Sequence, residues 1–131
     1  MRTRVKICGF TRVEDAVFAA HSGVDAIGLV FYLPSPRNVA VDQAIRIVRA
    51  LPAFTSVVGL FVDAEPSQIR ETLAVVPLDC IQFHGQETPA DCVLYGKPYI
   101  KAVRVQANTD VAALAEQYQG ASGLLLDAYH P

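Results

Sequence analysis

The apolar residues of this chain fall into six short continuous runs, separated by segments with a helical period. The runs lack the polar alternation of a half-exposed sheet, which is typical of parallel strands covered on both faces. They lie at residues 5–8, 26–31, 56–62, 80–83, 99–103 and 123–127. The intervening segments predict helices at about 12–23, 41–51, 65–75, 89–95 and 109–118. This strict alternation indicates an α/β chain with right-handed crossovers.

Start and stop signals support the predicted helices. Thr11 with Glu14 predicts a capping box before the first helix, and Gly23 predicts its end. Pro66 stands where a first helical residue would, and the segment Thr88 to Asp91 offers a cap, a first-turn proline and a first-turn acid. Asp63 is expected to cap the helix that follows it.

Two architectures fit the alternation, namely an open doubly wound sheet and a (βα) barrel. The strands start roughly 24 residues apart, and eight such units reach the lower end of barrel lengths. The chain has six strands and no segment that resembles a linker or a second domain, so residues 1–131 are expected to form one domain.

Candidate site residues follow from the strand ends and from strand parity. Ligands of both architectures bind at the carboxyl ends of the strands. Successive side chains of a strand alternate faces, so Lys6 and Cys8 share one face, and Gln82 and His84 share one. Asp127 ends the apolar run "GLLLD", where a carboxylate needs solvent or a partner.

The three cysteines differ in what they predict. For Cys80 and Cys92 a packing role is expected, because free cysteine is among the most buried residue types. Cys8 is different, since a cation at Lys6 on the same face favours a thiolate, which can act as a base or a nucleophile. Arg37 sits on a loop stiffened by two prolines, a good mount for a guanidinium that binds a carboxylate or phosphate.

Composition narrows the class of protein. The chain of 131 residues is 52% hydrophobic and 18% charged, with a net charge of −2, so it has no large basic field for nucleic acid. No apolar run approaches the roughly 20 residues of a membrane helix, and no signal region follows Met1. The cysteines lack the spacing of a zinc site. We therefore expect a cytoplasmic protein without a metal, a membrane partner or a nucleic-acid partner.

Five segments together resemble the phosphoribosylanthranilate isomerase family of tryptophan biosynthesis. They are "KICGFT" at 6–11, "SPRNV" at 35–39, "IQFHG" at 81–85, "IKAVRV" at 100–105 and "LLLDAYHP" at 124–131. The resemblance implies a TIM (βα)8 barrel, of which this chain holds strands one to six and five helices. It also implies an aldose–ketose isomerase that needs no cofactor. Its reaction is the Amadori rearrangement of N-(5-phosphoribosyl)anthranilate, a phosphosugar, to 1-(2-carboxyphenylamino)-1-deoxyribulose 5-phosphate.

The resemblance also implies roles for individual residues. Cys8 matches the general base that removes a proton from C2 of the sugar, and Asp127 matches the general acid that protonates the ring oxygen. Arg37 matches an arginine that contacts the substrate, facing the carboxylate of anthranilate. Three further residues are expected to line the same substrate site: Lys6, Gln82 and His84.

One departure from the family leads to further expectations. Family barrels have eight strands, and loops after strands seven and eight hold the substrate phosphate. We expect these 131 residues alone to be impaired in catalysis and to self-associate through open sheet edges. Two alternatives are an inactive structural fragment and a receiver-like signalling domain that uses Asp63 and Lys101, although "CGFTR" lacks the acids that such a domain needs after its first strand.

Overall fold

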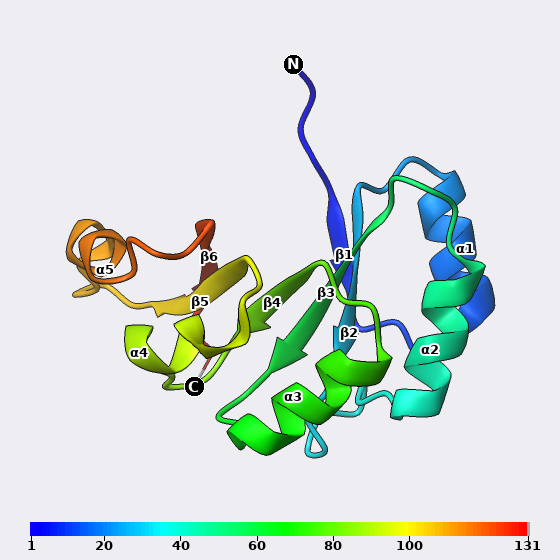
Figure 1. The fold of residues 1–131 in the computed structure, drawn as a ribbon. Helices are drawn as coiled ribbons and strands as arrows, with labels where there is room; N and C mark the ends of the chain where they lie inside the picture. Colours follow the sequence, from blue (N-terminus) through cyan, green and yellow to red (C-terminus); the bar gives the residue numbers. More distant parts are fainter. Residues whose placement is uncertain (131) are drawn as a thin grey trace.

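A computed structural model describes residues 1–130, which form one parallel six-stranded sheet with helices between successive strands (Figure 1). The strand order is β1-β2-β3-β4-β5-β6, the order of the sequence. The strands are β1 (Lys6–Cys8), β2 (Ala26–Val30), β3 (Ser56–Phe61), β4 (Cys80–Phe83), β5 (Tyr99–Val105) and β6 (Gly123–Ala128). Each lies within two residues of its predicted bounds.

Five α-helices and one 3₁₀ turn connect the strands. They are α1 (Val13–His21), α2 (Val41–Ala50), α3 (Pro66–Val75), α4 (Pro89–Cys92), η1 (Val93–Tyr95) and α5 (Val111–Gln117). Figure 1 shows these helices around the outside of the sheet, with α1 and α2 beside one end and α4 and α5 beside the other.

The strand order decides between the two architectures that fit the alternation, and it confirms the barrel that the family resemblance implied. A doubly wound sheet reverses direction at a switch point, which places helices on both faces. Here every crossover leads to the next strand in the same direction, so all right-handed connections lie on one face. The sheet is therefore that of a (βα) barrel. Within residues 1–130, β1 pairs only with β2 and β6 only with β5.

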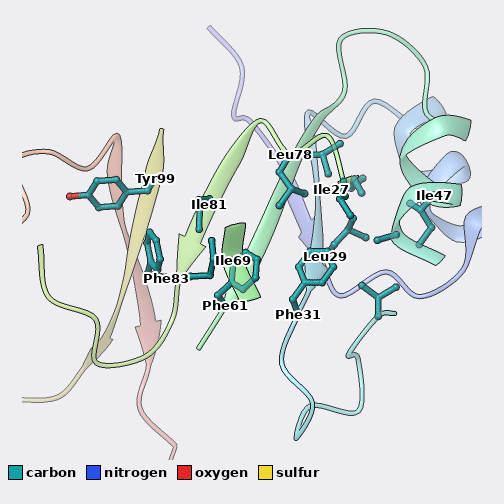
Figure 2. Packing of buried hydrophobic residues seen from close by; sticks show 14 of the residues in the cluster. Ile27, Leu29, Phe31, Ile47, Phe61, Ile69, Leu78, Ile81, Phe83 and Tyr99 are labelled. Atoms are coloured by element: carbon teal, nitrogen blue, oxygen red, sulfur yellow. The ribbon is translucent and has the colours of Figure 1, made fainter. Parts of the chain in front are cut away.

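The hydrophobic core lies between the sheet and its helices. Side chains of the central strands meet apolar residues of α2 and α3 there, as Figure 2 shows. Phe31 and Phe61 stack with ring centroids 5.3 Å apart. Ile47 of α2 and Ile69 of α3 cover this layer at 0% and 2% exposure. Burying a side chain of this size contributes about 1.5–3 kcal/mol, so this layer holds the helices on the outer face.

The helix signals had mixed outcomes. Thr88 forms the predicted capping box with Asp91, and Pro66 is the first residue of α3. The capping box expected at Thr11 is wrong, because α1 starts one residue later with Arg12 as its N-cap and no side-chain cap. The cap expected from Asp63 is also wrong, since Glu65 is the N-cap of α3.

Candidate active site

The inner face of the sheet carries the candidate site residues. Partners in a parallel ladder point to the same face, and residues two apart on a strand share it. Cys8 is paired with Gly28, and Asp127 is paired with Arg104. Following this parity across the sheet places all of the strand residues proposed for the site on the face opposite the helices: Lys6, Cys8, Gln82, His84 and Asp127.

Two glycines make room around Cys8. A Cβ at Gly28 would lie 2.7 Å from the Cys8 sulfur, so only glycine leaves space for the thiol there. Gly9 has a φ of +96°, which lets the chain turn out of β1. A Cβ at Gly9 would lie 2.5 Å from Cδ of Arg37, whose Nη1 donates a 2.9 Å hydrogen bond to the Cys8 carbonyl. The loop that carries Arg37 is thereby fastened to the end of β1.

Gly28→Ala should displace the Cys8 thiol. The added methyl group would overlap the sulfur, and overpacking of this kind costs about 1–3 kcal/mol. We expect a matching loss of unfolding free energy in urea and a changed rate of Cys8 alkylation, followed by peptide mapping. Gly123→Ala is the control, because a Cβ there meets nothing within 4 Å and its backbone is not left-handed. Equal effects of the two substitutions would contradict the role given to Gly28.

A chain of hydrogen bonds crosses the inner face from β1 to β6. Lys6 Nζ donates to Gln82 Oε1 at 2.8 Å. Gln82 Nε2 lies 3.0 Å from His84 Nδ1, and His84 Nε2 lies 3.2 Å from Asp127 Oδ2. Among residues 1–130, the amine of Lys6 thus bonds to Gln82 and not to the thiol of Cys8, with which the sequence analysis linked it.

A cavity of about 210 Å³ opens at the carboxyl ends of the strands. Its polar lining includes Arg37, His84 and Arg104. Arg104 lies at the carboxyl end of β5, and its pairing with Asp127 of β6 brings it beside the acid. Two guanidinium groups at one mouth suit an anionic ligand.

The other two thiols differ from Cys8 in their surroundings. Burial raises the pKa of Cys92 to about 11, and the side chain is 1% exposed. Burial also raises the pKa of Cys80. Both therefore stay protonated near neutral pH, which agrees with the packing roles expected for them.

Behind the site lies a buried ion pair that the sequence analysis missed. Lys101 and Glu87 meet at 2.9 Å with side chains 6% and 8% exposed. Lys101 also donates to the Gly85 carbonyl at 2.6 Å, and Glu87 accepts hydrogen bonds from the backbone N–H groups of Asp63 and Gly85. Asp63 in turn accepts from the Gln86 backbone N–H. The hydrogen bonds of this cluster hold the loop that follows His84 in place.

The strand order and this cluster together contradict the receiver-like alternative. Lys101 and Asp63 are both engaged in holding the loop after β4. The strand order also lacks the switch point of a doubly wound sheet. Within residues 1–130, no group of three or more His, Cys, Asp or Glu side chains is placed to hold a metal ion.

Known proteins are similar to this chain in sequence and in fold. The model of the N-(5'phosphoribosyl)anthranilate (PRA) isomerase family matches residues 5–130. The N-(5'-phosphoribosyl)anthranilate isomerase of Azotobacter vinelandii is 59% identical over 98% of this chain and 62% of its own length. The one of Pseudomonas fluorescens is 57% identical over 96% of this chain and 60% of its own length.

Solved structures extend the match to three dimensions. Phosphoribosyl anthranilate isomerase of Thermotoga maritima superposes with a TM-score of 0.91 at 39% identity, covering 99% of this chain and 63% of its own. A phosphoribosyl anthranilate isomerase in complex with reduced 1-(o-carboxyphenylamino)-1-deoxyribulose 5-phosphate gives 0.89 at 39% identity, covering 98% and 66%. The chain spans about three fifths of the length of the curated relatives it matches. It belongs to the N-(5'phosphoribosyl)anthranilate isomerase family.

Proposed function

We propose that this chain carries the proton-transfer groups of a phosphoribosylanthranilate isomerase, which catalyses an Amadori rearrangement in tryptophan biosynthesis. The observation that carries the proposal is the placement of Cys8 and Asp127 on one face, at the carboxyl ends of β1 and β6. A substrate lying across the mouth would have a base on one side and an acid on the other. That is what an aldose–ketose isomerisation requires.

Asp127 would act first, as the general acid. Its carboxyl proton goes to the ring oxygen of the sugar, the bond from C1 to that oxygen breaks, and the nitrogen lone pair forms a C=N bond. The oxygen keeps the electron pair of the broken bond. Asp127 is left as a carboxylate, beside Nε2 of His84.

Cys8 would act second, as the general base. Its thiolate takes the proton from C2, and the electron pair forms a C1=C2 bond while the charged nitrogen becomes neutral. The resulting enol gives the ketone when C1 gains a proton and the hydroxyl at C2 loses one. No electrons enter or leave, so the proposal includes no cofactor and no metal.

Arg37 would bind the anthranilate carboxylate. Its Nη1 bonds to the Cys8 carbonyl, and a guanidinium has five N–H donors, so others remain for a ligand. Being tied to β1, Arg37 would hold the aromatic end of the substrate close to the base. Arg104 on the other side of the same cavity would add a second positive charge.

The proposal includes the cell compartment. We place the enzyme in the cytoplasm, where its phosphosugar substrate would be made and used. No helix within residues 1–130 has the length and apolar character needed to cross a bilayer.

An isomerase assay tests the proposed function. The loss of phosphoribosylanthranilate fluorescence would be followed with residues 1–131 and with a chain extended to eight strands. We expect turnover in the extended chain and weak or no turnover in the shorter one, because remote phosphate contacts help to orient the sugar. An extended, folded chain without isomerase activity would overturn the proposal.

A polypeptide of residues 1–131 should self-associate. Within the described residues 1–130, the outer strands β1 and β6 have one unpaired edge each, and Ile7 and Leu126 are 43% and 56% exposed. Sedimentation velocity should show species larger than a monomer whose share grows with concentration. Ile7→Lys should weaken the association, whereas Phe18→Lys on exposed α1 should not. A compact monomer at all concentrations would contradict this prediction.

A further inference from the structure

We infer that Lys6 and Gln82 are positioning residues that fix the tautomer of His84, so that its Nε2–H donates to Asp127. The four side chains lie on β1, β4 and β6 and at the carboxyl end of β4, and each bonds to the next. In a merely structural contact it would not matter which side chain donates and which accepts. In this series of hydrogen bonds the donors and acceptors are fixed, because its first member, Lys6, can only donate.

The direction starts at Lys6. An ammonium group has three N–H donors and no acceptor, so the atom of Gln82 that faces it at 2.8 Å must be the carbonyl oxygen. A flipped amide would place its NH₂ group against the positive charge. Gln82 is 2% exposed, so the amide cannot turn to solvent for an alternative partner. The NH₂ group of Gln82 is thereby aimed at His84.

The direction then passes through the imidazole ring. The amide NH₂ of Gln82 lies 3.0 Å from Nδ1 of His84 and can only donate, so Nδ1 must accept. A neutral imidazole carries one N–H, which must therefore be on Nε2. That nitrogen lies 3.2 Å from Oδ2 of Asp127, which accepts the hydrogen bond.

The consequence for catalysis rests on the proposed function. With Oδ2 of Asp127 occupied by the N–H of His84, the proton that Asp127 delivers is placed on Oδ1. The carboxylate left after the transfer keeps a hydrogen bond from His84, which stabilises the charge as it develops. The opposite tautomer would set the lone pair of Nε2 against the carboxylate. Lys6 and Gln82 would thus act on the reaction without touching the substrate.

The tautomer can be read directly by nuclear magnetic resonance. Nitrogen-15 spectra of the histidine rings distinguish N–H from unprotonated nitrogen, at a pH where the same spectra show the ring to be neutral. His84→Asn assigns the signals by removing them, and His21, on the surface of α1, serves as an internal reference. We expect Nδ1 of His84 to be unprotonated and Nε2 to carry the proton.

Two variants test whether Lys6 and Gln82 determine the tautomer of His84. In Gln82→Glu a carboxylate can only accept, so it should pair with Lys6 and draw the proton of His84 to Nδ1. Lys6→Met removes the charge that orients the amide, so the two tautomers should mix. Lys6→Met keeps the inference testable if Gln82→Glu fails to fold. Nδ1–H in the unmodified chain, or an unchanged Nε2–H in every folded variant, would overturn the inference.

Kinetics in the eight-strand chain separate this inference from the proposed function. Gln82→Glu should lower kcat on the order of tenfold to a hundredfold, the range known for hydrogen-bond partners that orient metal-bound histidines, with KM little changed. A switched tautomer with unchanged kcat would overturn the positioning role. A correct tautomer in an extended chain without isomerase activity would count against the proposed function and leave the tautomer assignment standing.

Discussion

Cys8→Ala or Asp127→Asn should remove most isomerase turnover from an eight-strand chain that contains these residues. Each removes one of the two groups proposed to move a proton in the transition state, and general acid or base catalysis contributes about 10²–10⁴-fold. Binding should change little, because both side chains are small and Arg37 keeps its bond to the Cys8 carbonyl. The measurement is kcat and KM from the fluorescence assay, with product binding by calorimetry.

Cys80→Ala is the matched control for the thiol. Cys80 also lies on the inner face, where its ladder partner is Val58, but its position is at the amino end of β4. Its turnover should stay near that of the unmodified chain. A Cys8→Ala enzyme with similar activity would remove Cys8 from the mechanism, and near-normal turnover in Asp127→Asn would do the same for the acid.

The strands and helices could be read from the sequence because each is set by local chemistry. Continuous apolar runs such as "AIGLVF" bury both faces, and they became β2 and its neighbours. The alternation of strands and helices alone could not choose between a barrel and a doubly wound sheet, because strand order depends on contacts between distant segments. The family resemblance implied the barrel, and the strand order in the structure confirms it.

Helix starts were less predictable than helix positions. Thr88 and Asp91 fulfilled both halves of a capping box, whereas Thr11 fitted the same pattern and caps nothing. Arg12 has the extended backbone of an N-cap there, one residue later than the pattern requires. A short motif is compatible with two starts, and packing of the helix decides between them.

Strand parity predicted which site residues share a face, but not which of them touch. Lys6 was linked with Cys8 because both are on β1, yet its bond crosses to Gln82 on β4. The space that Gly28 leaves for the thiol depends on the pairing of β1 with β2. Contacts between strands need the register, which a single sequence does not reveal.

The buried pair of Lys101 and Glu87 did leave a signal in the sequence. Lys101 interrupts the apolar strand "YIKAV", and a lysine is almost never fully buried unless it is paired. The position of Lys101 on the fifth strand also suited the receiver-like signalling domain. The acid that follows the "HG" segment was the partner to look for, because Lys101 is the ladder partner of Phe83, the last residue of β4, and Glu87 lies in the loop that follows β4.

Glu87→Gln or Lys101→Met should cost more stability than any surface substitution in this chain. Removing one member leaves the other buried without its counter-charge, for which about 3–5 kcal/mol is the usual penalty. Glu87 also holds the N–H groups of Asp63 and Gly85, and its backbone carbonyl accepts from the Tyr118 hydroxyl at 2.6 Å. The measurement is urea unfolding by circular dichroism, at one fixed protein concentration.

Three control variants decide whether the loss of unfolding free energy comes from breaking the ion pair or from burial alone. Arg12→Ala breaks an exposed pair with Glu14 and should change the unfolding free energy by less than about 1 kcal/mol. Tyr99→Phe removes a buried hydroxyl that has no partner within residues 1–130, so it should also be tolerated within about 1 kcal/mol. The double variant Glu87→Gln with Lys101→Met should cost less than the sum of the single changes, because no unpaired charge remains. Additive costs would mean that the two side chains act independently, and a cost near that of Arg12→Ala would mean that water reaches the pair and screens it.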